Sequence, residues 1–112
     1  MTKPFHASIR RQMDKTTIDL SGEINALADQ DLQSAYTEAE SGSPATIVLN
    51  FSAVSYINST GIALIVGLMA RARKSHRTLA VYGLSDHYLE IFQITRLADF
   101  IKIYADEASV AV

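Results

Sequence analysis

Residues 5–24 alternate between apolar and polar side chains, which is the pattern of a β-strand with one buried face. Apolar residues fall on odd positions before the dipeptide Asp14-Lys15 and on even positions after it. The odd positions are Phe5, Ala7, Ile9 and Met13, and the even ones are Ile18, Leu20 and Ile24. A period of two on both sides of so short a break predicts an antiparallel hairpin. Gly22 predicts a bulge or a close backbone approach late in the second strand.

The period then changes to that of a helix, with apolar residues three or four apart at Ala28, Leu32, Ala35, Tyr36 and Ala39. Continuous apolar runs predict buried strands over residues 45–51 and 79–84, and residues 101–104 predict a last edge strand. Further helices are expected from Ser59, over residues 86–94 behind the N-cap Ser85, and as a small tail from Asp106. The order β-β-α-β-α-β-α-β-α predicts an α/β fold: a mixed β-sheet with a leading antiparallel hairpin, covered by about four helices.

The composition narrows the class of protein. With 112 residues, 48% of them hydrophobic and 20% charged, the chain has the size and balance of one globular domain over residues 1–112. It has no cysteine, which excludes thiol catalysis and thiolate metal sites. The net charge of −2 argues against direct binding of nucleic acid, because neutralising phosphates needs a basic surface.

Neither membrane insertion nor secretion is expected. The longest apolar stretch, residues 61–70, is about half of the roughly 20 residues that a membrane span needs. Residues 1–6 lack the cationic flank and the apolar run of a secretion signal. We therefore expect a cytoplasmic protein.

A basic run closes the second predicted helix and consists of Arg71, Arg73, Lys74 and Arg77. Cations at a helix C-terminus complement the helix dipole, and each contributes roughly a few tenths of a kcal/mol. A dedicated site for an anion or a partner is the alternative, and we favour the structural role.

A polar triplet, Asn58-Ser59-Thr60, opens this strongly apolar helix. It places hydroxyl groups at a helix N-terminus, where free backbone N–H groups and the positive end of the dipole favour an anion. A phosphate added to one of these hydroxyls would therefore meet donors that already point at it. The simpler alternative is that Asn58 or Ser59 is only an N-cap, which contributes about 1 kcal/mol.

Four segments of the chain resemble one family. Asn58-Ser59-Thr60-Gly61-Ile62, which follows the strand of residues 47–51, resembles the central motif of STAS domains, the fold of bacterial anti-sigma-factor antagonists. Leu20-Ser21-Gly22-Glu23-Ile24 is similar to a second recurring segment of that family. Thr95-Arg96-Leu97 and residues 101–107 fit the expected tail, so the resemblance covers nearly the whole chain in the right order.

The resemblance implies a partner and a switch. In that family, an anti-sigma factor that is also a serine kinase phosphorylates the serine or threonine of the central motif. The unphosphorylated antagonist binds the anti-sigma factor and frees the sigma factor, and phosphorylation abolishes the binding. By position, Ser59 is the expected phosphoacceptor and Thr60 the second choice. The expected partner-binding residues are Asn25, Asn58, Ser59, Thr60 and Gly61.

Three positions depart from the family pattern. The family usually has aspartate where this chain has Asn58, often aspartate where it has Asn25, and frequently glycine where it has Arg96. Two carboxylates near the acceptor are thus replaced by amides. A phosphate brings about −2 of charge into a contact surface, where it must be desolvated and would repel acidic groups of a partner.

Two other classes of function compete with the switch. The first is a non-switching STAS interaction subunit of a larger scaffold or of a transport complex, and self-association is a further option. The second is an enzyme, with Ser59 as nucleophile and His76 or His87 as base. The surroundings of Ser59 are not a Gly-x-Ser-x-Gly elbow. Gly61 and Gly67 also lack the Gly-Lys-Ser/Thr of a phosphate-binding loop. We therefore expect no enzymatic activity, no cofactor and no metal.

Overall fold

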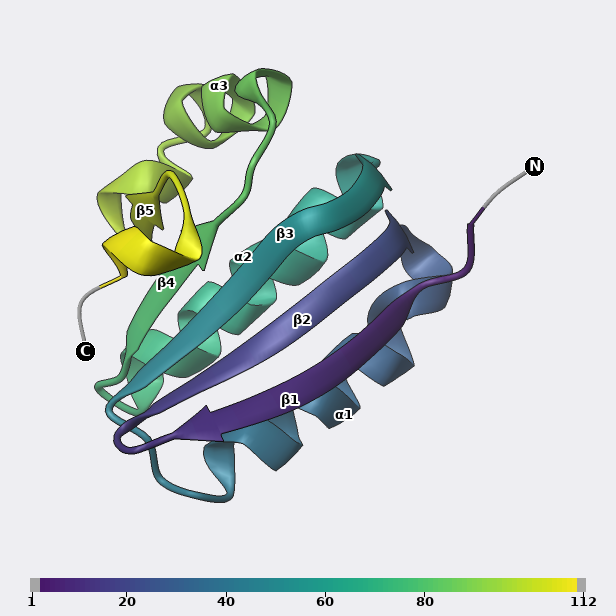
Figure 1. Cartoon of the computed structure of the whole chain (residues 1–112). Coiled ribbons are helices and arrows are strands. Elements are labelled where there is room, and N and C mark those ends of the chain that lie inside the picture. The colour runs from purple at the N-terminus through teal and green to yellow at the C-terminus, as the bar shows by residue number, and fades with distance from the viewer. Residues whose placement is uncertain (1–2, 111–112) are drawn as a thin grey trace.

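Within residues 3–110, five strands form one mixed sheet in the order β1-β2-β3-β4-β5 (Figure 1). The computed structural model describes residues 3–110. β1 and β2 pair antiparallel and the later pairs are parallel, so the predicted mixed sheet and its leading hairpin are confirmed. The hairpin turn is Met13-Asp14, one residue earlier than the break in the alternation, and Met13 has a left-handed φ of 42°. The strands are β1 (His6–Gln12), β2 (Lys15–Ile24), β3 (Thr46–Ile57), β4 (Thr78–Tyr82) and β5 (Lys102–Tyr104).

Residues 3–110 contain three α-helices: α1 (Asp29–Glu40), α2 (Ser59–Lys74) and α3 (Asp86–Ile94). About four were expected, and the fourth, the small helical tail predicted from Asp106, is a short 3-10 helix for which Asp106 is the N-cap. The tail is a single 3-10 turn, Glu107–Ser109, and the chain leaves it extended at Val110. The side chain of Val110 joins a cluster with Val48 on the sheet, so burial of this residue pulls the chain out of the helical path.

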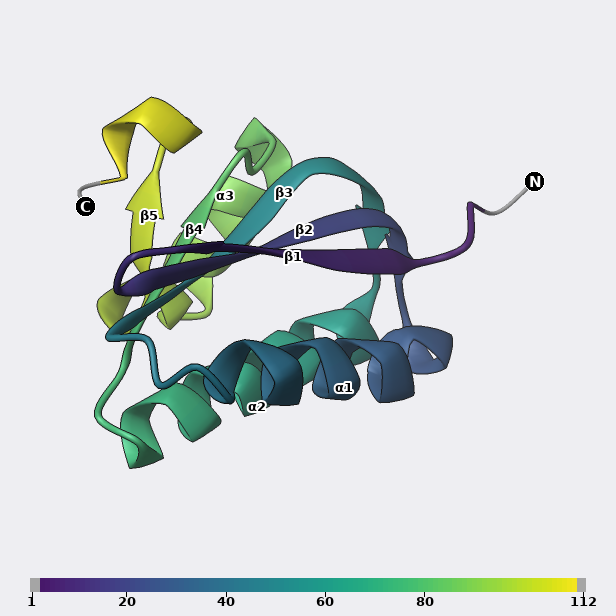
Figure 2. The ribbon, with the colours of Figure 1, turned by 60° about the horizontal axis from the view of Figure 1, so that its bottom comes forward.

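The main core lies between the sheet and the pair α1 and α2, which run across one of its faces (Figure 2). Alternate residues of β2 and β3, Ile18 and Leu49 among them, point into this core and are fully buried. Val48 faces the other way and packs with Ala80 and Tyr82. The apolar run of β3 is therefore buried on both faces of the sheet, as predicted.

β3 is longer than its apolar run. The sequence predicted a strand over residues 45–51 followed by a connection, and that boundary was wrong because the strand continues to Ile57. β2 is long enough to pair with all of it, with register shifts after Asp19 and at Gly22. Gly22 has a φ of 84°, and a Cβ at this position would overlap the carbonyl oxygen of Pro4. The predicted bulge and the predicted close approach are both confirmed.

The basic run at the end of α2 holds α2 against its neighbours. Arg71 donates a hydrogen bond to Glu40 of α1 at 2.6 Å, and Arg77 contacts the same carboxylate at 3.3 Å. The guanidinium of Arg73 lies over the ring of Phe100, 4.4 Å from its centroid. The contacts of the run are thus structural and mainly join α2 to α1, while the predicted complement to the helix dipole stays a prediction.

A polar network lies on the face of the sheet opposite α1 and α2. Arg10 donates to both carboxylate oxygens of Asp19, at 2.6 and 2.8 Å, and to Glu107 of the tail at 2.7 Å. The hydroxyl of Tyr82 donates to Glu107 at 3.2 Å. The hydrogen bonds from Arg10 hold the pKa of Asp19 and the pKa of Glu107 below their usual values. This network attaches the tail to the sheet.

Candidate functional site

The two long strands end side by side, and the predicted site residues begin where they end. Ile24 of β2 pairs with Ile57 of β3. Asn25 and Asn58 directly follow these residues, and the Asn58 amide donates to the Ile24 carbonyl at 3.2 Å. Parallel pairing therefore brings the two asparagines to the same end of the sheet.

Each of these asparagines caps a helical turn. Asn58 is the N-cap of α2, with extended backbone angles, and its side-chain oxygen accepts a hydrogen bond from the Gly61 amide at 2.8 Å. Asn25 caps the 3-10 turn η1 (Ala26–Ala28) in the same way, with an acceptor distance of 2.9 Å to the Leu27 amide. An aspartate would offer the same acceptor oxygen. The amides found here therefore preserve the local geometry and remove only the charge.

Gly61 allows α2 to begin close to the sheet. A Cβ at this position would overlap the carbonyl oxygen of Ile24 and would lie 2.9 Å from Cγ2 of Ile57. Gly61 itself is buried. Its role in the geometry of the site is to let the first turn of α2 lie against the ends of β2 and β3.

Ser59 and Thr60 are the first two residues of α2, and both are exposed. The prediction that Ser59 lies exposed at the N-terminus of the second helix is confirmed. The first turn of α2 contains no acidic residue, so the positive end of the helix dipole is not neutralised there. A phosphate on either hydroxyl would be favoured electrostatically.

An uncharged surface adjoins the two hydroxyls. From Ser59 to Ala70 the chain carries no charged residue, and the outer face of α2 exposes Ala63, Val66 and Ala70. α2 packs against η1, whose Leu27 is 90% exposed. We call the set Leu27, Ala63, Val66 and Ala70 the α2 surface.

Surface helices normally carry charged or polar residues on their outer face, and exposed apolar patches mark interaction sites. The sequence interpretation missed the α2 surface. The signal that could have revealed it is the absence of charge on every face of the first twelve residues of α2.

Of the two histidines considered as a base, His76 lies too far from Ser59 to form a catalytic pair with it. His76 follows the far end of α2, and a helix of 16 residues is about 24 Å long, so its ring cannot reach the hydroxyl. His87 lies on α3, where its ring packs against Tyr88 with the centroids 4.9 Å apart. The structure therefore excludes His76 as a base for Ser59 and gives His87 an aromatic neighbour instead.

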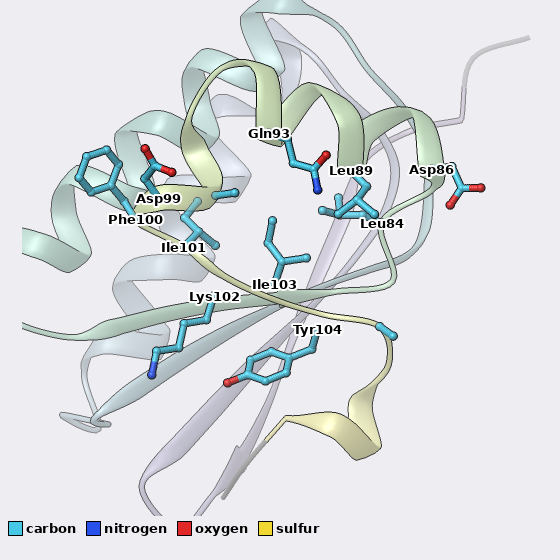
Figure 3. A pocket seen from close by; sticks show the side chains of 12 residues that line it. Leu84, Asp86, Leu89, Gln93, Asp99, Phe100, Ile101, Lys102, Ile103 and Tyr104 are labelled. Atoms are coloured by element: carbon cyan, nitrogen blue, oxygen red, sulfur yellow. The ribbon is translucent and has the colours of Figure 1, made fainter.

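A large cavity lies away from these residues. It measures about 1010 Å³ and runs between α3 and β5, where Leu89, Gln93 and Ile103 turn toward one another (Figure 3). A smaller cavity of about 220 Å³ does reach the site and is lined in part by Asn25 and Leu27. Within residues 3–110, no group of histidine and acidic side chains is arranged to hold a metal ion, and no helix has both the length and the apolar character to span a bilayer.

Known proteins share this arrangement. The family model of the STAS domain matches residues 6–110, which is nearly the whole chain. The chain belongs to the STAS domain family. The resemblance drawn from the motif at Asn58 and from the hairpin end is thereby confirmed.

Similar proteins carry related names. The anti-sigma-B factor antagonist of Listeria monocytogenes is 31% identical over 93 residues, which cover 83% of this STAS domain chain and 82% of that protein. An anti-sigma factor antagonist from Mycobacterium paratuberculosis has a similar structure, with a TM-score of 0.81, 18% identity and coverage of 96% and 93%. The Bacillus cell fate determinant SpoIIAA, solved in its phosphorylated form, is also similar, with a TM-score of 0.70 and 21% identity. The match covers 95% of this chain and 96% of that one. These structures share the STAS fold with the chain.

Proposed function

We propose that this STAS domain is an anti-sigma factor antagonist. It binds an anti-sigma factor that is also a serine kinase, phosphorylation of Ser59 switches the binding off, and the domain thereby regulates transcription indirectly. The observation that carries the proposal is the exposed Ser59 at the N-terminus of α2, next to the α2 surface. The Listeria relative, itself named an anti-sigma-B factor antagonist, supports it. In this proposal residues 1–112 act as one cytoplasmic binding domain without catalysis of their own.

The contact proposed for the partner is the α2 surface together with its polar rim. Leu27 is 90% exposed and Val66 40% exposed, and burying a large aliphatic side chain stabilises a complex by about 1.5–3 kcal/mol. Asn25, Asn58 and Thr60 form the polar rim around Ser59. This division into apolar centre and polar rim is typical of protein interfaces.

A phosphate on Ser59 would act on binding and not on folding. The positive end of the α2 dipole and the neutral side chains of Asn25 and Asn58 favour the added charge within the domain. Against a partner, the same charge would have to be desolvated within the contact surface. The switch therefore needs no conformational change in the STAS domain.

The test starts from the partner. The wild-type chain is used to capture its partner from an extract of the source cells, and the partner is identified by mass spectrometry and purified. Calorimetry then compares Ser59→Ala with Ser59→Asp and Ser59→Glu. The alanine variant is expected to bind as the wild type does, and the acidic variants at least tenfold more weakly. Ser34→Asp, which adds the same charge at an exposed position of α1, should bind normally.

Equal affinities of the Ala and Asp variants, in a complex that covers Ser59, would contradict the switch. The domain would then be a static subunit of a scaffold or of a transport complex. The phosphoacceptor is tested separately by incubating the purified partner with ATP and each variant. Ser59→Ala should abolish phosphorylation and Thr60→Ala should preserve it, and the reverse pattern would assign the acceptor to Thr60. Phosphorylation of neither hydroxyl would refute the kinase part of the proposal.

A further inference from the structure

In the part of the chain that the structure describes, the outer half of β3 has a strand on only one side. β4 pairs with residues 46–50 of β3 and then ends, whereas β2 accompanies β3 as far as Ile57. In Figure 1 the chain leaves β4 and turns away toward α3, so residues 51–57 of β3 project beyond it. A strand edge without a neighbour leaves backbone N–H and C=O groups that need other partners.

A tyrosine hydroxyl takes the place of the missing strand at the last residue of β3. Tyr88 of α3 accepts a hydrogen bond from the Ile57 amide at 2.8 Å and donates one to the Ile57 carbonyl at 3.4 Å. A phenol can do both, because its oxygen carries one proton and acceptor lone pairs. Tyr88 is 9% exposed and Ile57 is 4% exposed, so water cannot readily replace this partner. The hydroxyl is therefore the specific hydrogen-bond partner of the Ile57 backbone.

α3 is anchored to the same half of β3 at two further points. Gly83, which leads into α3, has a φ of 81°, and a Cβ there would lie 2.7 Å from the backbone nitrogen of Ser52. Deeper in the core, the rings of Phe51 and Phe92 meet edge to face with centroids 6.1 Å apart. These contacts hold α3 along the unpaired half of β3. They also position Tyr88 so that its hydroxyl reaches Ile57, the last residue of β3.

We propose that Tyr88 is a positioning residue for Ser59. It holds the backbone of Ile57 from the side of α3, while the Asn58 amide is held from the other side by Ile24 at 3.2 Å. One residue after Ser59 and Thr60, the Gly61 amide is bound to the Asn58 side chain. Ser59 thus lies between backbone amides that are held by hydrogen bonds on both sides. Tyr88, on a helix distant in sequence, makes one of these hydrogen bonds. The consequence for partner recognition rests on the proposed function, whereas the positioning itself is a property of the chain alone.

The positioning is tested by amide hydrogen exchange on the full chain, followed by NMR. Tyr88→Phe removes only the hydroxyl. Tyr36→Phe is the matched control, because the hydroxyl of Tyr36 is buried and has no hydrogen-bond partner among residues 3–110. In Tyr88→Phe, the amides of Asn58 and Gly61 are expected to exchange about tenfold faster or more, while those of β1 keep their wild-type rates. Tyr36→Phe should leave all of these rates unchanged.

Wild-type exchange at Asn58 and Gly61 in Tyr88→Phe would overturn the inference, and so would an equal acceleration throughout the domain. The second readout is affinity for the purified anti-sigma factor, which should fall at least about threefold in Tyr88→Phe and not in Tyr36→Phe. If Ser59→Asp weakens binding and Tyr88→Phe does not, the switch stands and the positioning fails. If Ser59→Asp binds normally while exchange at Asn58 rises in Tyr88→Phe, the proposed function fails and the positioning stands.

Discussion

Alanine at two glycines of α2 is expected to change stability in opposite directions. A Cβ at Gly61 would overlap the carbonyl oxygen of Ile24 and lie 2.9 Å from Cγ2 of Ile57. That carbonyl belongs to the backbone of β2 and cannot rotate away, so α2 would have to move off the sheet. At Gly67, by contrast, nothing lies within 4 Å of an added Cβ. Both positions lie in the same helix, Gly61 in its first turn and Gly67 in its interior.

The magnitudes follow from two opposing effects. Overpacking of a tight site costs about 1–3 kcal/mol. Replacing glycine by alanine within a helix stabilises it by about 0.8–1.0 kcal/mol. At Gly67 only the second effect operates, so Gly67→Ala should gain up to about 1 kcal/mol. At Gly61 the overlap is with a backbone oxygen, which puts the overpacking cost in the upper part of its range, at about 2–3 kcal/mol, so we expect a net loss of about 1–2 kcal/mol.

Urea unfolding and thermal melts measure both variants. A difference of about 2 kcal/mol between them corresponds to at least about 8 °C in Tm for a domain of this size. The m-value should match that of the wild type in each case, which shows that the same surface is exposed on unfolding. Stability of Gly61→Ala equal to or above the wild type would refute the close approach of α2 to Ile24. A loss in Gly67→Ala would refute the open environment of Gly67.

Three further predictions concern the core and the polar network. Ile65→Asp puts a charge at a position that is 1% exposed and should abolish folding, because the cost of several kcal/mol is close to the total stability of the domain. Ser59→Ala, by contrast, should change the free energy of unfolding by no more than about 1 kcal/mol. Equal losses in thermal melts would contradict the topology. Tyr36→Phe removes a buried hydroxyl that has no hydrogen-bond partner among residues 3–110, and burial raises the pKa of this side chain to about 12. The variant should be as stable as the wild type or up to about 1 kcal/mol more stable in urea unfolding, and a clear loss of stability would reveal a hydrogen-bond partner of the hydroxyl. The hydrogen bond from Arg10 lowers the pKa of Asp19, so the stability that it adds is present at pH 7 and is lost as the pH falls below about 4. Because both side chains are partly exposed, the deficit of Asp19→Asn should be about 1 kcal/mol or less at pH 7 and should shrink at pH 3, and a deficit that grows toward pH 3 would refute this coupling.

The sequence by itself determined the features that depend on near neighbours. The alternation over residues 5–24 predicted the β1–β2 hairpin, and the polar triplet at Asn58 predicted where α2 begins and that Ser59 is exposed. Each of these depends on residues within one hairpin or one helical turn. Periodicity and the bond from a cap side chain to a nearby backbone amide decide such features locally.

Only the tertiary structure decided how distant segments complete the site. β3 runs to Ile57 because β2 pairs with it that far, and its last amide is bound by Tyr88, 31 residues further along the chain. The fit of Gly61 against Ile24 and the exposure of Leu27 beside α2 likewise depend on where separate elements pack. A residue's place in a periodic pattern records which face of its own element it occupies. The periodic pattern does not show which neighbouring element this face will contact, and contacts of that kind, from Tyr88 and Ile24, position Ser59.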